Sequence, residues 1–150
     1  MRCKRCGKKA VLKMPRHNTS VCPGCLNQYV VDQVRRAVRG QGMFSNDERV
    51  LVAVSGGKDS LVLWDVLMRM GYDAAGLHVQ LGIGDYSKLS LEKTRAFAES
   101  RGVELITHSL EKEEGAGVQE LADLTNRSPC SACGVMKRYN FNRLAVENGF

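Results

Sequence analysis

The chain lacks any apolar run long enough to cross a membrane, and its first residues lack the pattern of a secretory signal peptide. It also contains no internal repeat and no low-complexity tract. A membrane-spanning, secreted or repetitive protein is therefore not indicated. We expect a globular protein that works in the cytoplasm and has no membrane partner.

Acidic residues are almost missing from residues 1–40, which hold ten Lys or Arg residues against one acid, Asp32. Residues 41–150 hold twelve against fifteen, so the net charge of +6 arises from the first forty residues. A compact basic surface favours a phosphodiester partner, although charge alone fits a solvated surface equally well. The candidate RNA contacts are Arg2, Lys4, Arg5, Lys8, Lys9, Lys13 and Arg16. Aromatic residues are also scarce, 6% of the chain, so stacking on single-stranded bases is not indicated.

Four of the six cysteines form two Cys-x-x-Cys pairs, Cys3/Cys6 and Cys22/Cys25, separated by fifteen residues. This spacing is typical of a zinc site with four thiolate ligands. Disulfides in a secreted protein are the competing interpretation, and the missing signal peptide argues against them. His17 lies between the pairs and could be a ligand, but four cysteines already fill a tetrahedral site. A surface or nucleic-acid-contacting role suits His17 better.

The third pair, Cys130/Cys133, stands alone and precedes a helical pattern that ends at Gly149. A helix amino terminus favours the thiolate form of nearby cysteines, and Lys137 and Arg138 add positive charge. These features indicate reactive or metal-binding sulfur. Two ordinary buried thiols are the structural alternative.

A glycine-containing loop, Ser55-Gly56-Gly57-Lys58-Asp59-Ser60, joins an apolar strand at residues 50–54 to a helix at residues 61–71. A strand, a glycine turn and a helix in this order direct backbone N–H groups and the helix dipole at one point, which suits a phosphate. The loop is not a Walker A motif, because Asp59 follows the lysine where Ser or Thr is required. A turn that binds no ligand is the alternative.

Strands and helices alternate after this loop. We predict further strands at residues 74–79 and 103–107, a loop at 80–86, a helix at 90–102, and a solvated loop or helix start at 111–114. This order predicts an α/β fold with a doubly wound parallel sheet that binds its ligand at the carboxyl ends of the strands. The predicted domains are 1–40, a zinc ribbon with a basic helix ending at Gly40, and 47–150, joined by a linker.

The loop resembles the pyrophosphate loop, SGGxDS, of the N-type ATP pyrophosphatases, which cleave ATP between its α- and β-phosphates. With an amino-terminal four-cysteine ribbon and a downstream Cys-x-x-Cys pair, the whole chain resembles the TtuA/TtcA family of tRNA 2-thiolation enzymes. The resemblance implies that ATP, with Mg²⁺, is held by the loop and by two more distant segments. The implied ATP-binding residues are Ala53, Val54, Ser55, Gly56, Gly57, Lys58, Asp59, Ser60, His78, Val79 and Lys137.

The same resemblance implies catalytic roles for Cys130, Cys133 and Lys58, with Lys58 stabilising charge on the departing pyrophosphate. It further implies Zn²⁺ at Cys3, Cys6, Cys22 and Cys25, and a [4Fe–4S] cluster at Cys130, Cys133 and a third cysteine outside this chain. A persulfide on the same pair is the alternative sulfur chemistry. The expected partners are tRNA, a sulfur donor and a second copy of the full-length protein.

The implied reaction is adenylation of a tRNA uridine carbonyl oxygen, followed by its replacement with sulfur. Two other functions stay open: a related enzyme that modifies tRNA without sulfur, and a zinc-ribbon RNA-binding protein with an idle nucleotide loop. The chain ends at Phe150, before the family's third cysteine. We therefore expect these residues alone to be catalytically incomplete.

Overall fold

The computed structural model describes residues 1–150, which form two compact units, Met1–Ser45 and Asn46–Phe150. No helix in it combines the length and the apolar character needed to traverse a lipid bilayer. The two units are described separately below.

The first unit contains a short hairpin followed by one long helix. Strands β1 (Leu12–Met14) and β2 (Thr19–Val21) pair antiparallel and are joined by the 3-10 turn η1 (Pro15–His17). Helix α1 (Pro23–Gly40) follows at once, with Pro23 at its first turn, where the missing N–H costs nothing. One buried cluster of this unit consists of Cys3, Ala10, Val21 and Cys22, so cysteines make up half of that cluster.

The second unit contains a three-stranded parallel sheet in the order β3-β4-β5, with β4 (Ala74–Gln80) between β3 (Val50–Ala53) and β5 (Leu105–Ser109). Helices α2 (Lys58–Arg69) and α3 (Gly84–Arg101) link the strands. Short helices α4 (Leu110–Glu113) and α5 (Val118–Leu124) lead to α6 (Pro129–Glu147). The predicted α/β fold with a parallel sheet is confirmed.

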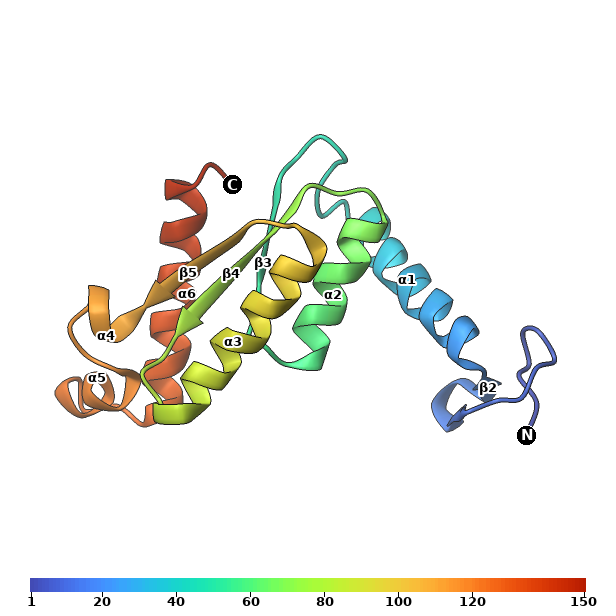
Figure 1. Ribbon diagram of the computed structural model, residues 1–150, viewed down its shortest axis with the longest axis horizontal. Helices are drawn as coiled ribbons and strands as arrows, with labels where there is room; N and C mark the ends of the chain where they lie inside the picture. The colour runs from blue at the N-terminus through green and yellow to red at the C-terminus, as the bar shows by residue number, and fades with distance from the viewer. The chain divides into compact units, whose positions relative to one another are not determined.

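The faces of β4 divide the helices between two layers. On one face Trp64 of α2 and Phe97 of α3 pack together over Gly76, with ring centroids 5.3 Å apart. On the other face Leu77 and Val79 join a core cluster packed against α6, which passes behind the sheet in Figure 1 while α3 lies in front. Because side chains alternate along a strand, consecutive β4 residues supply both layers.

Several predicted boundaries were wrong. Helix α3 begins at Gly84, not Ser90, because the Ser87 hydroxyl accepts a hydrogen bond from the Ile83 N–H (3.0 Å) and closes a first turn inside the expected loop. Strand β5 begins two residues later than predicted, since the Val103 N–H is engaged by the Ala98 carbonyl at the end of α3. Helix α5 was not predicted at all.

Candidate functional site

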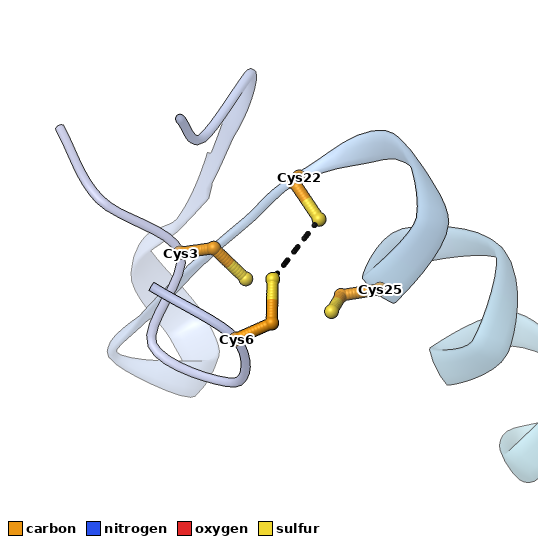
Figure 2. Close-up of side chains that lie close together, drawn as sticks. All are labelled: Cys3, Cys6, Cys22 and Cys25. Atoms are coloured by element: carbon orange, nitrogen blue, oxygen red, sulfur yellow. Dashed lines mark hydrogen bonds between the residues drawn. The ribbon is translucent and has the colours of Figure 1, made fainter. Parts of the chain in front are cut away.

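Four cysteine thiols of the first unit converge on one point. The sulfur atoms of Cys3, Cys6, Cys22 and Cys25 all lie within 4.8 Å of one another, and those of Cys6 and Cys22 are 3.5 Å apart (Figure 2). Four sulfurs each about 2.3 Å from a tetrahedral zinc ion would be about 3.8 Å apart. The residues therefore fit a metal ion without rearrangement of the backbone. His17 is not a member of this group.

Local backbone geometry places each of these thiols. Cys3 and Cys6 lie in a tight turn closed by the Gly7 N–H, which donates to the Cys3 carbonyl (2.9 Å) from a left-handed backbone conformation. Cys22 caps α1 and Cys25 lies in its first turn, so the second pair is positioned by the start of a helix. All six cysteines of the chain are free thiols.

Contacts within the group lower the pKa of some of its thiols and raise the pKa of another. Burial raises the pKa of Cys3, but hydrogen bonds from the backbone of Cys22, Cys6 and Arg5 outweigh it and lower that pKa to about 6. A backbone hydrogen bond from Cys25 likewise lowers the pKa of Cys22. Hydrogen bonds with the Cys6 and Cys22 side chains raise the pKa of Cys25 to about 12. Without a cation the cluster keeps some of its protons, and a bound cation would replace them.

The predicted RNA-contacting cations belong to the same unit as this group and all are exposed: Arg2, Lys4, Arg5, Lys8, Lys9, Lys13 and Arg16. The side chains of two of them form polar contacts inside the unit. Lys4 donates to the Asn18 carbonyl (2.7 Å), and Arg5 forms an ion pair with Asp32 (3.3 Å). The others extend into solvent, as a surface for phosphodiesters requires.

The predicted phosphate loop is held closed by its own serines. The Ser55 N–H donates to the Ser60 hydroxyl (3.2 Å), which donates to the Gly57 carbonyl (3.0 Å). Gly56 has a φ of +78°, and a Cβ there would lie 2.6 Å from the Ser90 carbonyl oxygen. Gly57 caps α2, whose first N–H groups have no partner within the helix. The loop therefore presents backbone donors at a helix amino terminus.

Lys58 and Asp59 are exposed to solvent and do not form a buried pair. Their side chains are 86% and 91% exposed and contact one another, with the ammonium 2.7 Å from the carboxylate. Neither lines the cavity at the carboxyl end of the sheet, which is described next. Lys58 is therefore free to swing toward a bound anion.

A cavity of about 200 Å³ at the carboxyl end of the sheet unites residues from three distant predicted segments. Ala53, Val54 and Ser55 lead from β3 into the loop, His78 and Val79 end β4, and Lys137 extends from α6. Gly56 and Gly57 of the adjoining loop and residues 58–60 at the start of α2 do not line it.

Sequence reasoning missed the other lining residues: Leu81, Tyr86, Ser87, Ser90 and Phe141. Tyr86, Ser87 and Ser90 lie on the first turns of α3, where we predicted a glycine-rich loop through Tyr86 and a helix beginning only at Ser90. If the prediction had started the helix at Gly84, these three residues would have fallen on one helix face.

A larger hollow of about 720 Å³ lies at the opposite end of the sheet. It is lined by Asp73, Ala74 and Glu104, which precede or begin β4 and β5. Open parallel sheets bind ligands beyond the carboxyl ends of their strands. We therefore take the smaller cavity as the candidate site.

His78 is the buried ionisable side chain that faces the cavity beside the buried Ser87, with 3% of its surface exposed. Its Nδ1–H donates to the Val54 carbonyl oxygen (2.8 Å), and its Nε2 has no hydrogen-bond partner. Burial lowers the pKa of His78, the Val54 hydrogen bond acts in the opposite direction, and the positive charges of Arg95 and Lys137 lower it further. The ring is therefore neutral at pH 7.

The third cysteine pair lies within α6, not just before it as predicted. Ser128 caps this helix by accepting the Ser131 N–H (3.4 Å), which places Cys130 and Cys133 in its first turns. Cys130 is exposed, whereas Cys133 is half-buried and packs with Phe141 against the core cluster. Steps of three and four residues put both cysteines on the helix face of Lys137. The pair therefore shares a helix face with two cavity-lining side chains.

Comparisons with known proteins agree with these features. Residues 2–27 match the model of the amino-terminal LIM domain of the 2-thiouridine synthetase TtuA. A tRNA-5-methyluridine(54) 2-sulfurtransferase of Thermus thermophilus is 54% identical over 150 residues, which are 100% of this chain and 47% of that protein. The enzyme of the same name from Thermotoga maritima is 34% identical, over 100% of this chain and 50% of its own length.

The U34-tRNA thiolase NcsA from Methanococcus maripaludis, solved with its [4Fe–4S] cluster, matches the fold with a TM-score of 0.82 and 26% identity. The match covers 99% of this chain and 50% of that one. The resemblance to the tRNA 2-thiolation enzymes is confirmed. The chain spans about half the length of the curated relatives that it matches.

Proposed function

We propose that the protein is an ATP-dependent tRNA sulfurtransferase, which adenylates a uridine carbonyl oxygen and replaces it with sulfur. One observation carries the proposal: the cavity at the carboxyl end of the sheet collects Ser55, His78 and Lys137, and the α6 face that supplies Lys137 also carries Cys130 and Cys133. The nucleotide site that activates the uridine carbonyl and the sulfur that replaces its oxygen would then belong to one site. The names of the relatives support the same reaction.

The chain's own residues would handle ATP by positioning and by electrostatics. The Ser55–Ser60 loop and the start of α2 would hold the pyrophosphate with Mg²⁺, while the backbone at His78 and Val79 would contact the adenine. Lys137 would meet the phosphates from the opposite side of the cavity. Lys58, whose side chain is exposed, would neutralise charge that develops on the departing pyrophosphate.

The six cysteines would bind two metal-containing groups. Cys3, Cys6, Cys22 and Cys25 would hold Zn²⁺, which would supply folding energy to a unit with a very small core. Cys130 and Cys133 would provide two of the three thiolates of a [4Fe–4S] cluster, the third coming from another segment or chain. A cluster with three thiolates would supply one open iron for sulfide.

The proposed substrate is tRNA, bound in part by the basic surface of the first unit. Six unpaired cysteines suit the reducing cytoplasm, where we place the protein. The sulfur donor and the homodimer expected of the full-length protein stay predictions.

The test uses the natural protein, with any residues that follow Phe150, purified without oxygen and incubated with tRNA, ATP and a sulfide source. Nucleoside mass spectrometry would measure 2-thiouridine, and chromatography would measure AMP. We expect Lys137→Ala to abolish both products and Lys93→Ala, an exposed lysine on α3, to retain both.

Each rival function gives a different result in this assay. AMP formation with modified but sulfur-free tRNA, unaffected by Cys130→Ser, would identify an enzyme without sulfur chemistry. RNA binding that is indifferent to ATP and yields no AMP would identify an RNA-binding protein with an idle loop.

A further inference from the structure

A cleft of about 270 Å³ lies wholly within the first unit, away from the four cysteine sulfurs. Its walls come from the first cysteine turn, from η1 and from α1, and include Arg5, His17, Tyr29, Asp32, Gln33 and Arg36. The volume is near the lower end of the range of small-molecule sites, roughly 300–1,000 Å³. The function proposed above gives most of these residues no role.

One wall of the cleft is aromatic. The rings of His17 and Tyr29 have centroids 5.8 Å apart at an angle of 60°, and the His17 Nε2 lies 3.5 Å from the Tyr29 hydroxyl oxygen. His17 is exposed and Tyr29 is half-buried. The sequence showed few aromatic residues among the cations, but the turn at η1 brings two rings that are twelve residues apart into contact.

The cleft is also lined by Arg5 and Arg36, and a carboxylate holds Arg5 in place. Asp32, the one acid of residues 1–40, accepts hydrogen bonds from Gln28 (2.9 Å), Arg35 (3.1 Å) and Arg5 (3.3 Å). The Gln28 hydrogen bond and the two arginines hold the pKa of Asp32 below its usual range. The ion pair holds Arg5 of the cysteine turn against α1, so a metal in the cysteine group would also stiffen this wall.

A cleft lined by both aromatic rings and guanidinium groups suits a planar, electron-rich ring that is attached to a phosphate. Nucleobases stack on aromatic and guanidinium planes, and arginine binds phosphate oxygens through paired N–H groups. Gln33 adds an amide that can hydrogen-bond a base edge. Arg36 is exposed at the cleft and has no ion-pair partner, which leaves it available for the phosphate.

We propose that this cleft binds one unstacked nucleobase of the RNA substrate, with the base against Tyr29 and His17 and its phosphate at Arg36. This inference rests on the proposed function for its choice of ligand, because tRNA would be the RNA at hand. It gives the first unit a base-binding role in addition to its electrostatic attraction for the backbone. A base exposed in a loop or bulge is the form that such a cleft accepts.

The test measures binding of an RNA hairpin with a single bulged 2-aminopurine, whose fluorescence falls when the base stacks. Truncation of one stacking side chain should lower the affinity roughly 5- to 150-fold. We expect Tyr29→Leu to produce a loss of this size and to remove the fluorescence quench. Tyr29→Phe should keep both, because the ring is retained.

Lys8→Ala provides the matched control, since Lys8 is an exposed cation of the same unit that does not line the cleft. It should weaken binding modestly, reduce the salt dependence and leave the quench intact. Metal content equal to wild type would show that Tyr29→Leu leaves the cysteine group folded.

Four outcomes would overturn the inference. Equal affinity for a hairpin with an abasic bulge would show that only the backbone is bound. Displacement of the RNA by polyglutamate, dependent on Tyr29, would reassign the cleft to an acidic protein segment. No RNA binding by the wild type would overturn the tRNA substrate as well, whereas wild-type binding that Tyr29→Leu leaves unchanged would refute the cleft alone.

Discussion

The Nδ1–H of His78 donates a 2.8 Å hydrogen bond to the carbonyl oxygen of Val54 and so ties the end of β4 to the residue that precedes the phosphate loop. A carbonyl can only accept, so the bond fixes the tautomer and leaves Nε2 unprotonated in the neutral ring. Thr94 of α3 lies 3.5 Å from the same Nδ1, which places the ring between the sheet and α3. His78 therefore links the start of the phosphate loop to β4 and α3.

This relationship predicts a pH dependence of stability. The pKa of His78 is lowered from 6.5 in the folded chain, chiefly by burial, so below about pH 6.5 the unfolded chain binds a proton that the folded chain refuses. The His78 contribution is fully present above that pH and is lost as the pH falls through the window below it. We expect wild type to lose more stability than His78→Gln between pH 7.5 and 5.

Urea unfolding followed by Trp64 fluorescence would measure this difference. Trp64 is the chain's one tryptophan, it is fully buried, and its indole N–H donates to the Ala74 carbonyl (2.8 Å). Its signal therefore reports on the second unit alone. His17→Gln, at an exposed position of the first unit, should leave the pH profile unchanged, and identical profiles for wild type and His78→Gln would contradict the prediction.

Removal of the cysteine-bound metal should affect one unit only. Cys22→Ser deletes a buried ligand, so the metal content should fall from about one ion per chain to near zero and hydrogen exchange should accelerate through residues 1–45. Trp64 fluorescence should not change. Elemental analysis of Cys22→Ser beside Cys133→Ser checks the assignment, because full metal content in Cys22→Ser would place the ion elsewhere.

The residue pattern predicted the parts of the fold that depend on local periodicity. The apolar run that became β3, the helical spacing after Lys58 and the glycine that ends α3 each carry a local signal. The start of α3 did not, because Gly82 and Gly84 resemble a loop until Ser87 closes the first turn. Tertiary contact, which no local pattern encodes, produced the His17–Tyr29 pair and the approach of Ser90 to Gly56.

The two loop glycines should separate stability from ligand binding. In Gly56→Ala the new Cβ would lie 2.6 Å from the Ser90 carbonyl, on a backbone with φ of +78°, so unfolding free energy should fall by about 2 kcal/mol or more. Gly57→Ala meets only the Ser55 hydroxyl, at 3.3 Å, and should cost under about 1 kcal/mol.

Both glycine variants should weaken ATP binding, since a methyl group at either position obstructs approach of the anion to the backbone. Urea unfolding and ATP titration by calorimetry would measure the two effects separately. Wild-type ATP affinity in Gly57→Ala would show that the phosphate site lies outside this loop.

The last prediction distinguishes cluster chemistry from persulfide chemistry at Cys130 and Cys133. Both thiols lie on one face of α6, one exposed and one half-buried, and the four cysteines of the first unit already form a separate group. We therefore expect the natural protein, reconstituted without oxygen, to take up roughly four irons and four sulfides per chain, with absorption that bleaches in air.

Cys130→Ala should abolish iron uptake and tRNA thiolation together. Ser131→Ala, in the same helical turn, should retain both, because Ser131 contributes a backbone N–H to the cap and no side-chain ligand. The persulfide route makes the opposite prediction for iron: rigorously iron-free protein, supplied with a persulfide as sulfur donor in place of sulfide, would thiolate tRNA at the wild-type rate, and mass spectrometry would find the transferred sulfur on one of the two cysteines.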